Sequence, residues 1–195
     1  EENNSWNWRG KKRAYFHLPF SQLACQNLAT ALMVIEVLEE RLAVSEASIH
    51  QGLKTVSLPG RIEIKENLIT EIVDVAHNPA AVAFLAKRLQ KLSCLGRTHA
   101  VFSMLADKDL SGSLREIKNQ IDEWHVAPLQ VARGASQEKL KKAFEAEKIT
   151  SVYFYASIQE AQQAARSVTR ENDRLLIFGS FHVVAQCRNK SAFAE

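Results

Sequence analysis

The sequence predicts an α/β fold in which a Rossmann-like, doubly wound and mostly parallel sheet occupies residues 62–195. From residue 68 onward, each apolar, strand-like segment is followed by an amphipathic, helix-like one. The strand segments are almost continuously apolar, which is typical of parallel strands buried on both faces. A breaker cluster, Leu58-Pro59-Gly60-Arg61, separates this region from residues 1–57. Right-handed crossovers would make the sheet doubly wound.

Residues 1–57 have the pattern of the end of a larger domain. One or two short strands are expected in residues 1–20, which contain Trp6, Trp8 and an alternating segment around Tyr15, closed by Pro19. Helical spacing of apolar residues predicts a helix over 21–42. Ser45 is expected to cap a second helix that continues through Leu53. So few elements would form a weak core alone, and residues 58–61 are expected to be a linker or hinge.

The larger region predicts alternating elements. Strands are expected at 62–65, 68–75, 98–104, 124–129, 151–155 and 174–179. Helices are expected at 79–91, 111–121, 136–147, 157–170 and 181–190. Pro79 suits a first helical turn, Ser136 an N-cap, and Ser157 with Glu160 a capping box.

Composition excludes several classes of function. A net charge of +3 is too small to indicate a nucleic-acid or membrane-surface protein. No apolar run approaches the roughly 18 residues that span a bilayer, and no signal peptide is expected. The three cysteines are widely spaced and form neither a metal-ligand pattern nor a disulfide framework. We therefore expect a cytoplasmic protein.

Polar residues follow the strands of the expected sheet, and parallel strands bring such turns to one edge, where ligands bind. The four turns are Asp74-Val75-Ala76-His77-Asn78-Pro79, Leu105-Ala106-Asp107-Lys108-Asp109, Ala132-Arg133-Gly134-Ala135 and Gly179-Ser180-Phe181-His182. Together they offer carboxylates, an imidazole, cations and helix N-termini, which suit anionic ligands.

Each residue also has an ordinary structural interpretation, which the sequence leaves open. Asp74 could hold a ribose hydroxyl or cap its own turn, and His77 could bind a carboxylate or only the backbone. Ser180 could bind an anion or simply cap a helix. Arg61 could reach a phosphate or lie on the surface, and Asn27 could merely cap a helix. The segment 107–109 could pair its lysine with an anionic ligand or be a solvated loop.

Several familiar motifs are absent. The seven glycines form neither G-x-G nor G-x-x-x-x-G-K-[ST], so there is neither a dinucleotide fingerprint nor a P-loop. Ser180, His182 and Asp74 could suggest a hydrolase triad, but the G-x-S-x-G elbow and the usual residue order are missing.

The order and spacing of these segments resemble the dihydrofolate synthase/folylpolyglutamate synthase family of the Mur ligase superfamily. The resemblance rests on Asn27-Leu28-Ala29-Thr30-Ala31-Leu32, Leu58-Pro59-Gly60-Arg61, Asp74 to Pro79, Met104 to Asp109, Arg133-Gly134-Ala135 and Gly179 to His182. It covers essentially the whole chain, and Phe181-His182 looks like the bacterial bifunctional type.

The resemblance implies ATP-dependent ligation of L-glutamate to dihydropteroate and to folates, through an acyl phosphate and with Mg²⁺. It implies that Asn27, Arg61 and Asp74 contact ATP and that His77 and Ser180 place glutamate. It further implies site-edge positions, namely Asn78, Lys108, Asp109, Arg133 and His182.

The family's P-loop, Mg²⁺ ligands and most of its pterin pocket lie on an N-terminal ATPase domain that this sequence lacks. The resemblance therefore implies that residues 1–57 are the last part of that domain and residues 62–195 the Mur-type C-terminal domain. No metal ligands are expected in this chain, and the full-length enzyme is expected to be a monomer. The alternative is a non-enzymatic module that binds nucleotides or anions and descends from such a ligase.

Overall fold

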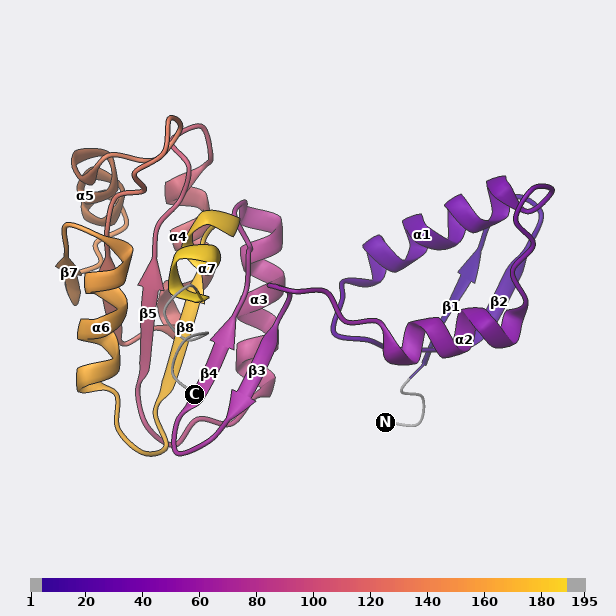
Figure 1. The fold of residues 1–195 in the computed structure, drawn as a ribbon, viewed down its shortest axis with the longest axis horizontal. Helices are drawn as coiled ribbons and strands as arrows, with labels where there is room; N and C mark the ends of the chain where they lie inside the picture. The colour runs from indigo at the N-terminus through magenta and orange to yellow at the C-terminus, as the bar shows by residue number, and fades with distance from the viewer. Residues whose placement is uncertain (1–4, 189–195) are drawn as a thin grey trace. The chain divides into compact units, whose positions relative to one another are not determined.

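The computed structural model describes residues 5–188, and the chain forms two compact units, Glu1–Arg61 and Ile62–Glu195 (Figure 1). The division falls at the end of the expected linker 58–61. That the first unit belongs to an ATPase domain stays a prediction. Among the described helices, none has the length and apolar character needed to cross a bilayer.

The first unit is a β-hairpin packed with two helices. Strands β1 (Ser5–Arg9) and β2 (Ala14–Pro19) pair antiparallel, and helices α1 (Cys25–Leu38) and α2 (Glu46–Thr55) follow. Helix α1 is shorter than the expected 21–42, because the backbone bends at residues 22–23 before it and turns at residues 39–41 after it. The core of the unit consists of Trp8, Tyr15, Leu18, Leu28, Leu32, Ile49 and Leu53.

Glu36 of α1 ties the hairpin turn to the helix. Its buried carboxylate accepts backbone N–H bonds from Lys11 at 3.0 Å, Lys12 at 2.7 Å and Arg13 at 2.7 Å. A carboxylate is an acceptor only, so three converging N–H groups suit its ionised form. Although burial acts to raise the pKa of Glu36, these N–H bonds outweigh it and lower the pKa below the usual 4.5.

The stability that Glu36 contributes is therefore expected to depend on pH. A lowered folded-state pKa means that the contribution is complete above about pH 4.5 and is lost as the pH falls through the folded-state pKa. The amide shifts of Lys12 and Arg13 should titrate with a midpoint below 4.5. Glu36→Gln should destabilise the first unit near pH 7 and matter less once the pH is below the folded-state pKa of Glu36. An amide titration midpoint above 4.5 would contradict this.

The second unit is built on a six-stranded sheet in the order β3-β4-β8-β5-β6-β7. Its strands are β3 (Glu63–Glu66), β4 (Thr70–Val73), β5 (Thr98–Phe102), β6 (Glu123–Val126), β7 (Val152–Phe154) and β8 (Arg174–Phe178). Only β3 pairs antiparallel, with β4; the other neighbours are parallel. The predicted Rossmann-like, mostly parallel α/β fold is therefore confirmed.

The expected alternation of strands and helices is also confirmed. The helices are α3 (Pro79–Lys91), α4 (Leu110–Ile117), α5 (Gln137–Ala146), α6 (Ile158–Val168) and α7 (Phe181–Arg188). The helix expected at 111–121 is α4 plus a 3₁₀ turn, Lys118–Gln120. Residues 189–190 of the last expected helix lie outside the described residues. Ser45, Ser136 and Ser157 cap their helices as predicted. The Glu160 carboxylate accepts from the Ala156 N–H and not from the N–H of the cap residue Ser157, so the capping box is incomplete.

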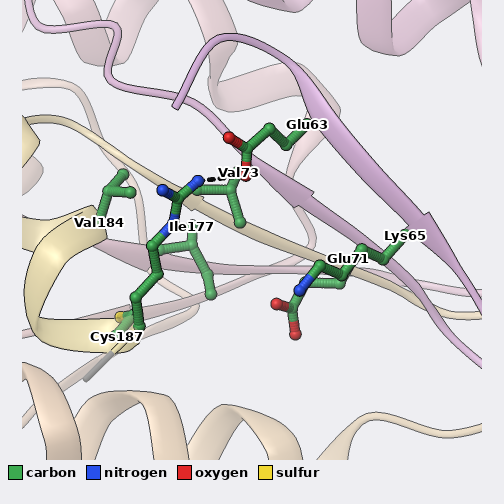
Figure 2. A pocket seen from close by; sticks show the side chains of 8 residues that line it. Glu63, Lys65, Glu71, Val73, Ile177, Val184 and Cys187 are labelled. Atoms are coloured by element: carbon green, nitrogen blue, oxygen red, sulfur yellow. Dashed lines mark hydrogen bonds and ion pairs between the residues drawn. The ribbon is translucent and has the colours of Figure 1, made fainter. Parts of the chain in front are cut away.

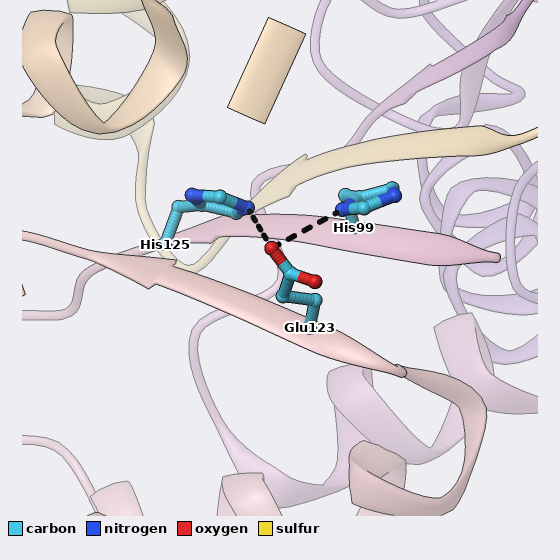
Figure 3. A group of neighbouring side chains, drawn as sticks. All are labelled: His99, Glu123 and His125. Carbon is cyan, nitrogen blue, oxygen red and sulfur yellow. Dashed lines mark ion pairs between the residues drawn. The ribbon is translucent and has the colours of Figure 1, made fainter. Parts of the chain in front are cut away.

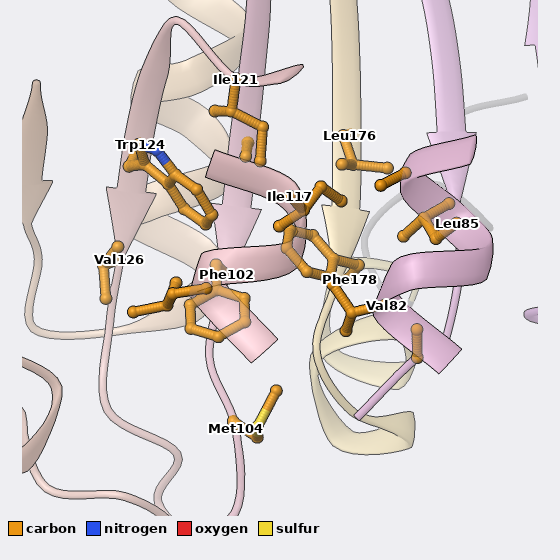
Figure 4. Close-up of a cluster of buried hydrophobic side chains, with 14 of the residues drawn as sticks. Val82, Leu85, Phe102, Met104, Ile117, Ile121, Trp124, Val126, Leu176 and Phe178 are labelled. Atoms are coloured by element: carbon orange, nitrogen blue, oxygen red, sulfur yellow. The ribbon is translucent and has the colours of Figure 1, made fainter. Parts of the chain in front are cut away.

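Helices cover both faces of the sheet. One core joins α3, α4 and α5 to the sheet through residues such as Leu85, Leu114 and Phe144. Figure 4 shows part of this core, including Leu85 of α3 and Ile117 of α4. Successive β8 residues alternate between the two cores: Leu176 and Phe178 face this one, whereas Leu175 and Ile177 face the core of α6 and α7. This alternation follows from the period of two in a strand.

Candidate functional site

The topology marks one place on the sheet edge for a ligand. Strand β8 lies between β4 and β5, yet α7, which follows β8, covers the opposite face from α3 and α4, which follow β4 and β5. Where successive connections leave on opposite faces, a crevice opens at the carboxyl ends of the strands. The polar turns after β4, β5 and β8 border this position, and the turn after β6 adjoins them.

Asp74 follows β4 and acts as a clamp within the second unit. Its buried side chain accepts N–H bonds from Ala76 at 2.6 Å and from Ile62 at 2.9 Å. Its own N–H continues the ladder to the carbonyl of Ile177 on β8 at 3.0 Å. The turn-capping interpretation is therefore correct, and the same bonds hold the carboxylate in a fixed orientation.

His77 and Phe181 bring the turns after β4 and β8 together. Their ring centroids are 6.4 Å apart. The His77 Nδ1 lies 2.8 Å from the carbonyl oxygen of Val75, so Nδ1–H donates there and Nε2 is left for a ligand. Asn78 caps α3 by accepting from the Ala81 N–H, with Pro79 in the first turn as predicted.

Gly179 makes the approach of β8 to β5 possible. It has a φ of +114°, and a Cβ atom there would clash with the carbonyl oxygen of Ser103. Ser180 is buried and caps α7, accepting from the Val183 N–H at 3.1 Å. The Ser103 hydroxyl is fully buried and has no hydrogen-bond partner among residues 5–188. Sequence reasoning missed Ser103, which lies near the end of the expected strand 98–104 and directly follows the observed strand β5.

The loops after β5 and β6 are joined around Asp107. Its carboxylate lies 3.3 Å from the Lys108 Nζ and 3.8 Å from the Arg133 Nε. Burial acts to raise the pKa of Asp107, but the two cations lower it overall. Backbone bonds reinforce the link, including Ala106 N–H to the Arg133 carbonyl at 2.7 Å. The structure thus brings Lys108 and Arg133 together through a carboxylate to which the sequence analysis had assigned no role.

The remaining predicted residues differ in their settings. Asp109 caps α4 by accepting from the Gly112 N–H at 2.8 Å, and His182 is exposed in the first turn of α7. Asn27 and Arg61 belong to the other unit. Asn27 is exposed in α1 and does not cap it, since that position is Ala24, so the capping interpretation is wrong. The Arg61 N–H donates to the Leu58 carbonyl in the linker.

A separate small pocket lies on the α7 side of strands β3, β4 and β8 (Figure 2). Arg188 forms an ion pair with Glu63 there, and Glu71 pairs with Arg166. The buried thiol of Cys187 is unreactive, because burial raises its pKa to about 12. This pocket holds none of the turn residues and is not the candidate site.

Comparisons with known proteins agree with the architecture. Residues 60–181 match the model of the Mur ligase, glutamate ligase domain. The chain is 36% identical over 183 residues to the dihydrofolate synthase/folylpolyglutamate synthase of Escherichia coli, covering 94% of this chain and 42% of that protein. The protein of the same name from Buchnera aphidicola of Acyrthosiphon pisum is 32% identical over 186 residues, which is 95% of this chain and 44% of that protein.

Solved structures give the same result. E. coli FolC in complex with DHPP and ADP superposes with a TM-score of 0.82 at 33% identity, over 98% of this chain and 44% of that one. A bifunctional folylpolyglutamate synthase/dihydrofolate synthase with Mn, AMPPNP and L-glutamate bound gives a TM-score of 0.83 at 34% identity, over 98% of this chain and 45% of that one. The chain thus spans less than half the length of the relatives it matches. It belongs to the Mur ligase family, and its residues 60–181 match the glutamate ligase domain of that family.

Proposed function

We propose that this chain is the C-terminal portion of an ATP-dependent ligase that joins L-glutamate to dihydropteroate and to folates. The observation that carries the proposal is the match along 94% of the chain to a dihydrofolate synthase/folylpolyglutamate synthase. The gathering of polar turns beside β8 supports it, because ATP, an acyl phosphate and glutamate are all anionic. Phosphorylation of the substrate carboxylate would make it an acyl donor, which the glutamate amine then attacks.

The proposed roles follow the chemistry of each side chain. His77 and Ser180 would place glutamate: the His77 Nε2 can bind it when protonated, and Ser180 stands at the N-terminus of α7. Asp74, with its orientation fixed by two N–H bonds, would accept from the ribose. Asn27 and Arg61 would contact adenine and phosphate. Site-edge roles are proposed for Asn78, Lys108, Asp109, Arg133 and His182.

We assign the magnesium ligands to the part of the longer protein that lies outside this chain. Asp107 is paired with Lys108 and Arg133, and Asp109 caps α4, so these carboxylates are already engaged with cations and backbone N–H groups. Mg²⁺ prefers several oxygen ligands in octahedral geometry, which these engaged carboxylates do not offer. In the proposed reaction the ion neutralises the phosphates of ATP, while the groups of this chain bind and orient the substrates.

Two further observations support the proposal that the chain works with an N-terminal ATPase domain. Helix α1 exposes Met33, Val34 and Val37, which lie on one side of it, and such a patch is expected where another domain packs. The linker has left-handed backbone at Gly60, with a φ of 76°, and so does the β-branched Ile62 directly after it, with a φ of 47°. Conformations of this kind mark switch regions in other proteins, which fits a hinge at residues 58–61.

The test is a comparison of this chain with the full-length protein that contains it. The full-length protein is expected to release ADP only when both L-glutamate and dihydropteroate or a folate are present. The isolated chain is expected to release none above background, because it lacks a P-loop. Turnover by the isolated chain, or turnover by the full-length protein without glutamate, would contradict the proposal.

In the full-length protein, His77→Ala is expected to raise the KM for glutamate by about tenfold or more, with the KM for ATP little changed. His50→Ala, on helix α2, is the matched control and should leave both constants unchanged. If His77→Ala altered only the KM for ATP, the role given to His77 would be wrong. A non-enzymatic module would show no turnover in either form.

A further inference from the structure

A cluster of two histidines and a glutamate lies at the opposite end of the strands from the polar turns. His99 is on β5, and Glu123 and His125 are on β6 (Figure 3). In the parallel register His99 pairs with Glu123 and Val101 pairs with His125, so the three side chains share one face of the sheet. It is the face of α6 and α7, to which Val101 also contributes. Sequence reasoning missed the cluster, because register cannot be read from one sequence.

Three of the four imidazole nitrogens of this cluster are buried without hydrogen bonds among the described residues. His99 is 2% and His125 1% exposed. Both ring nitrogens of His99, and Nε2 of His125, have no hydrogen-bond partner within the described part of the chain. The Glu123 Oε1 lies 3.4 Å from the His125 Nε2 and 3.9 Å from the His99 Nδ1. Since buried polar groups are nearly always hydrogen-bonded, this arrangement requires an explanation.

We propose that His99, Glu123 and His125 form a binding site for a divalent zinc-type metal ion. One ligand atom from each residue lies within 4.8 Å of the others. Tetrahedral zinc with bonds of about 2.1 Å separates its ligand atoms by about 3.4 Å. The largest adjustment is therefore about 1.4 Å, which side-chain rotation can supply. Two imidazoles and a carboxylate, with a fourth position for water, are an established zinc ligand set.

Neighbouring groups already orient both imidazoles for metal binding. The His125 Nδ1 lies 3.0 Å from the Tyr155 hydroxyl, which leaves Nε2 directed at Glu123. The His99 Nε2 lies 3.6 Å from the Asp173 Oδ2, which leaves Nδ1 directed at Glu123. A metal-bound histidine usually donates its other N–H to such a partner, often a carboxylate. Asp173 is itself held, since it accepts N–H bonds from Arg97 and Arg170.

The local charge is compatible with a cation. The Glu123 carboxylate lies between the two imidazoles, so the cluster offers one anionic and two nitrogen donors to a divalent cation. Arg97 lies 3.7 Å from Glu123 through its other oxygen, Oε2, and is largely exposed, so it marks the side from which solvent reaches Glu123. Because the cluster is remote from the polar turns, the ion would join β5 to β6 and take no part in catalysis.

The test uses the whole chain without an affinity tag, stripped of metal by a chelator and titrated with Zn²⁺ against a chromophoric competitor. One equivalent is expected to bind with a micromolar or tighter Kd and to raise the melting temperature. X-ray absorption should show only nitrogen and oxygen ligands, including imidazole, at about 2.0–2.1 Å. Failure of the folded chain to retain zinc, or sulfur in the first shell, would overturn the proposal.

Variants locate the site. Glu123→Gln and His125→Gln keep side-chain size and are expected to weaken zinc binding at least tenfold and to abolish the thermal shift. Tyr155→Phe removes only the bond that orients His125 and should weaken binding by about 10-fold to 100-fold. His50→Gln removes the exposed His50–Glu46 pair of α2, and Cys94→Ser removes a nearby thiol; both should bind like the unchanged chain. Unchanged affinity in folded Glu123→Gln and His125→Gln would overturn the assignment.

Discussion

Gly179→Ala is expected to lower the free energy of unfolding of the second unit by about 3 kcal/mol or more. Two effects act together. The backbone φ of +114° is strained for any residue with a side chain, and the new Cβ atom would clash with the Ser103 carbonyl oxygen. The contact is with backbone, so it cannot be relieved by rotation of a side chain. Relief would require β8 to move away from β5, which would displace Ser180 from the candidate site.

Denaturant unfolding followed by far-UV circular dichroism measures this effect. Gly52→Ala is the control, because Gly52 lies within α2 and a Cβ atom there meets nothing within 4 Å. Alanine is the better helix former, so the control should be neutral or stabilising by up to about 1 kcal/mol. A Gly179→Ala protein as stable as the unchanged chain would mean that the close approach of β8 to Ser103 is wrong.

Asp74→Ala is expected to destabilise the second unit by about 2–4 kcal/mol. The substitution removes two charge-assisted acceptors and leaves the N–H groups of Ile62 and Ala76 without them. Ile62 is the first residue of this unit and has a φ of 47°. Loss of its hydrogen bond to Asp74 should therefore also loosen the connection to the linker. Asp74→Asn keeps one acceptor oxygen, so its stability should lie between those of the unchanged chain and Asp74→Ala.

The control for Asp74 is Ser136→Ala, which removes a single exposed cap bond to the Lys139 N–H in the same unit. Its expected effect is about 1 kcal/mol. Hydrogen exchange at the Ile62 and Ala76 amides gives the local measurement, and protection should fall in Asp74→Ala and persist in Ser136→Ala. Equal protection of these amides in the unchanged chain, Asp74→Ala and Ser136→Ala would contradict the role of Asp74 as a clamp. Any loss of ATP binding in an Asp74 variant must be compared with these values before it is attributed to a ribose contact.

The sequence predicted the alternation of elements well because the apolar strands and the capping serines are local features. Ser136 and Ser157 mark helix starts through bonds to residues only three positions away. Sheet order is not local: the position of β8 between β4 and β5 depends on packing across the whole unit. The ends of α1 were misplaced because turns can contain the same apolar residues as helices.

The candidate site divides in the same way. The four turns could be predicted because polar residues follow apolar strands. The interactions within these turns could not be predicted. Asp107 joins its loop to a second loop through Arg133, which is 26 residues further along the chain. Asp74 accepts a bond from Ile62, which lies before the preceding strands. The cluster of His99, Glu123 and His125 depends on strand register and therefore could not be predicted from the sequence. The ligand roles given to Asn27, Arg61, His77 and Ser180 stay predictions.

The place of β8 in the sheet has a consequence for synthesis on the ribosome. Strand β8 is the last strand among residues 5–188, yet it joins β4 to β5. Until residues 174–178 emerge, the hairpin β3–β4 and the parallel group β5–β6–β7 cannot become one sheet, and each presents an edge with unpaired backbone groups. Nascent chains that stall or end before β8 should therefore aggregate or recruit chaperones. Chains released after α7 should escape this, because their sheet is complete.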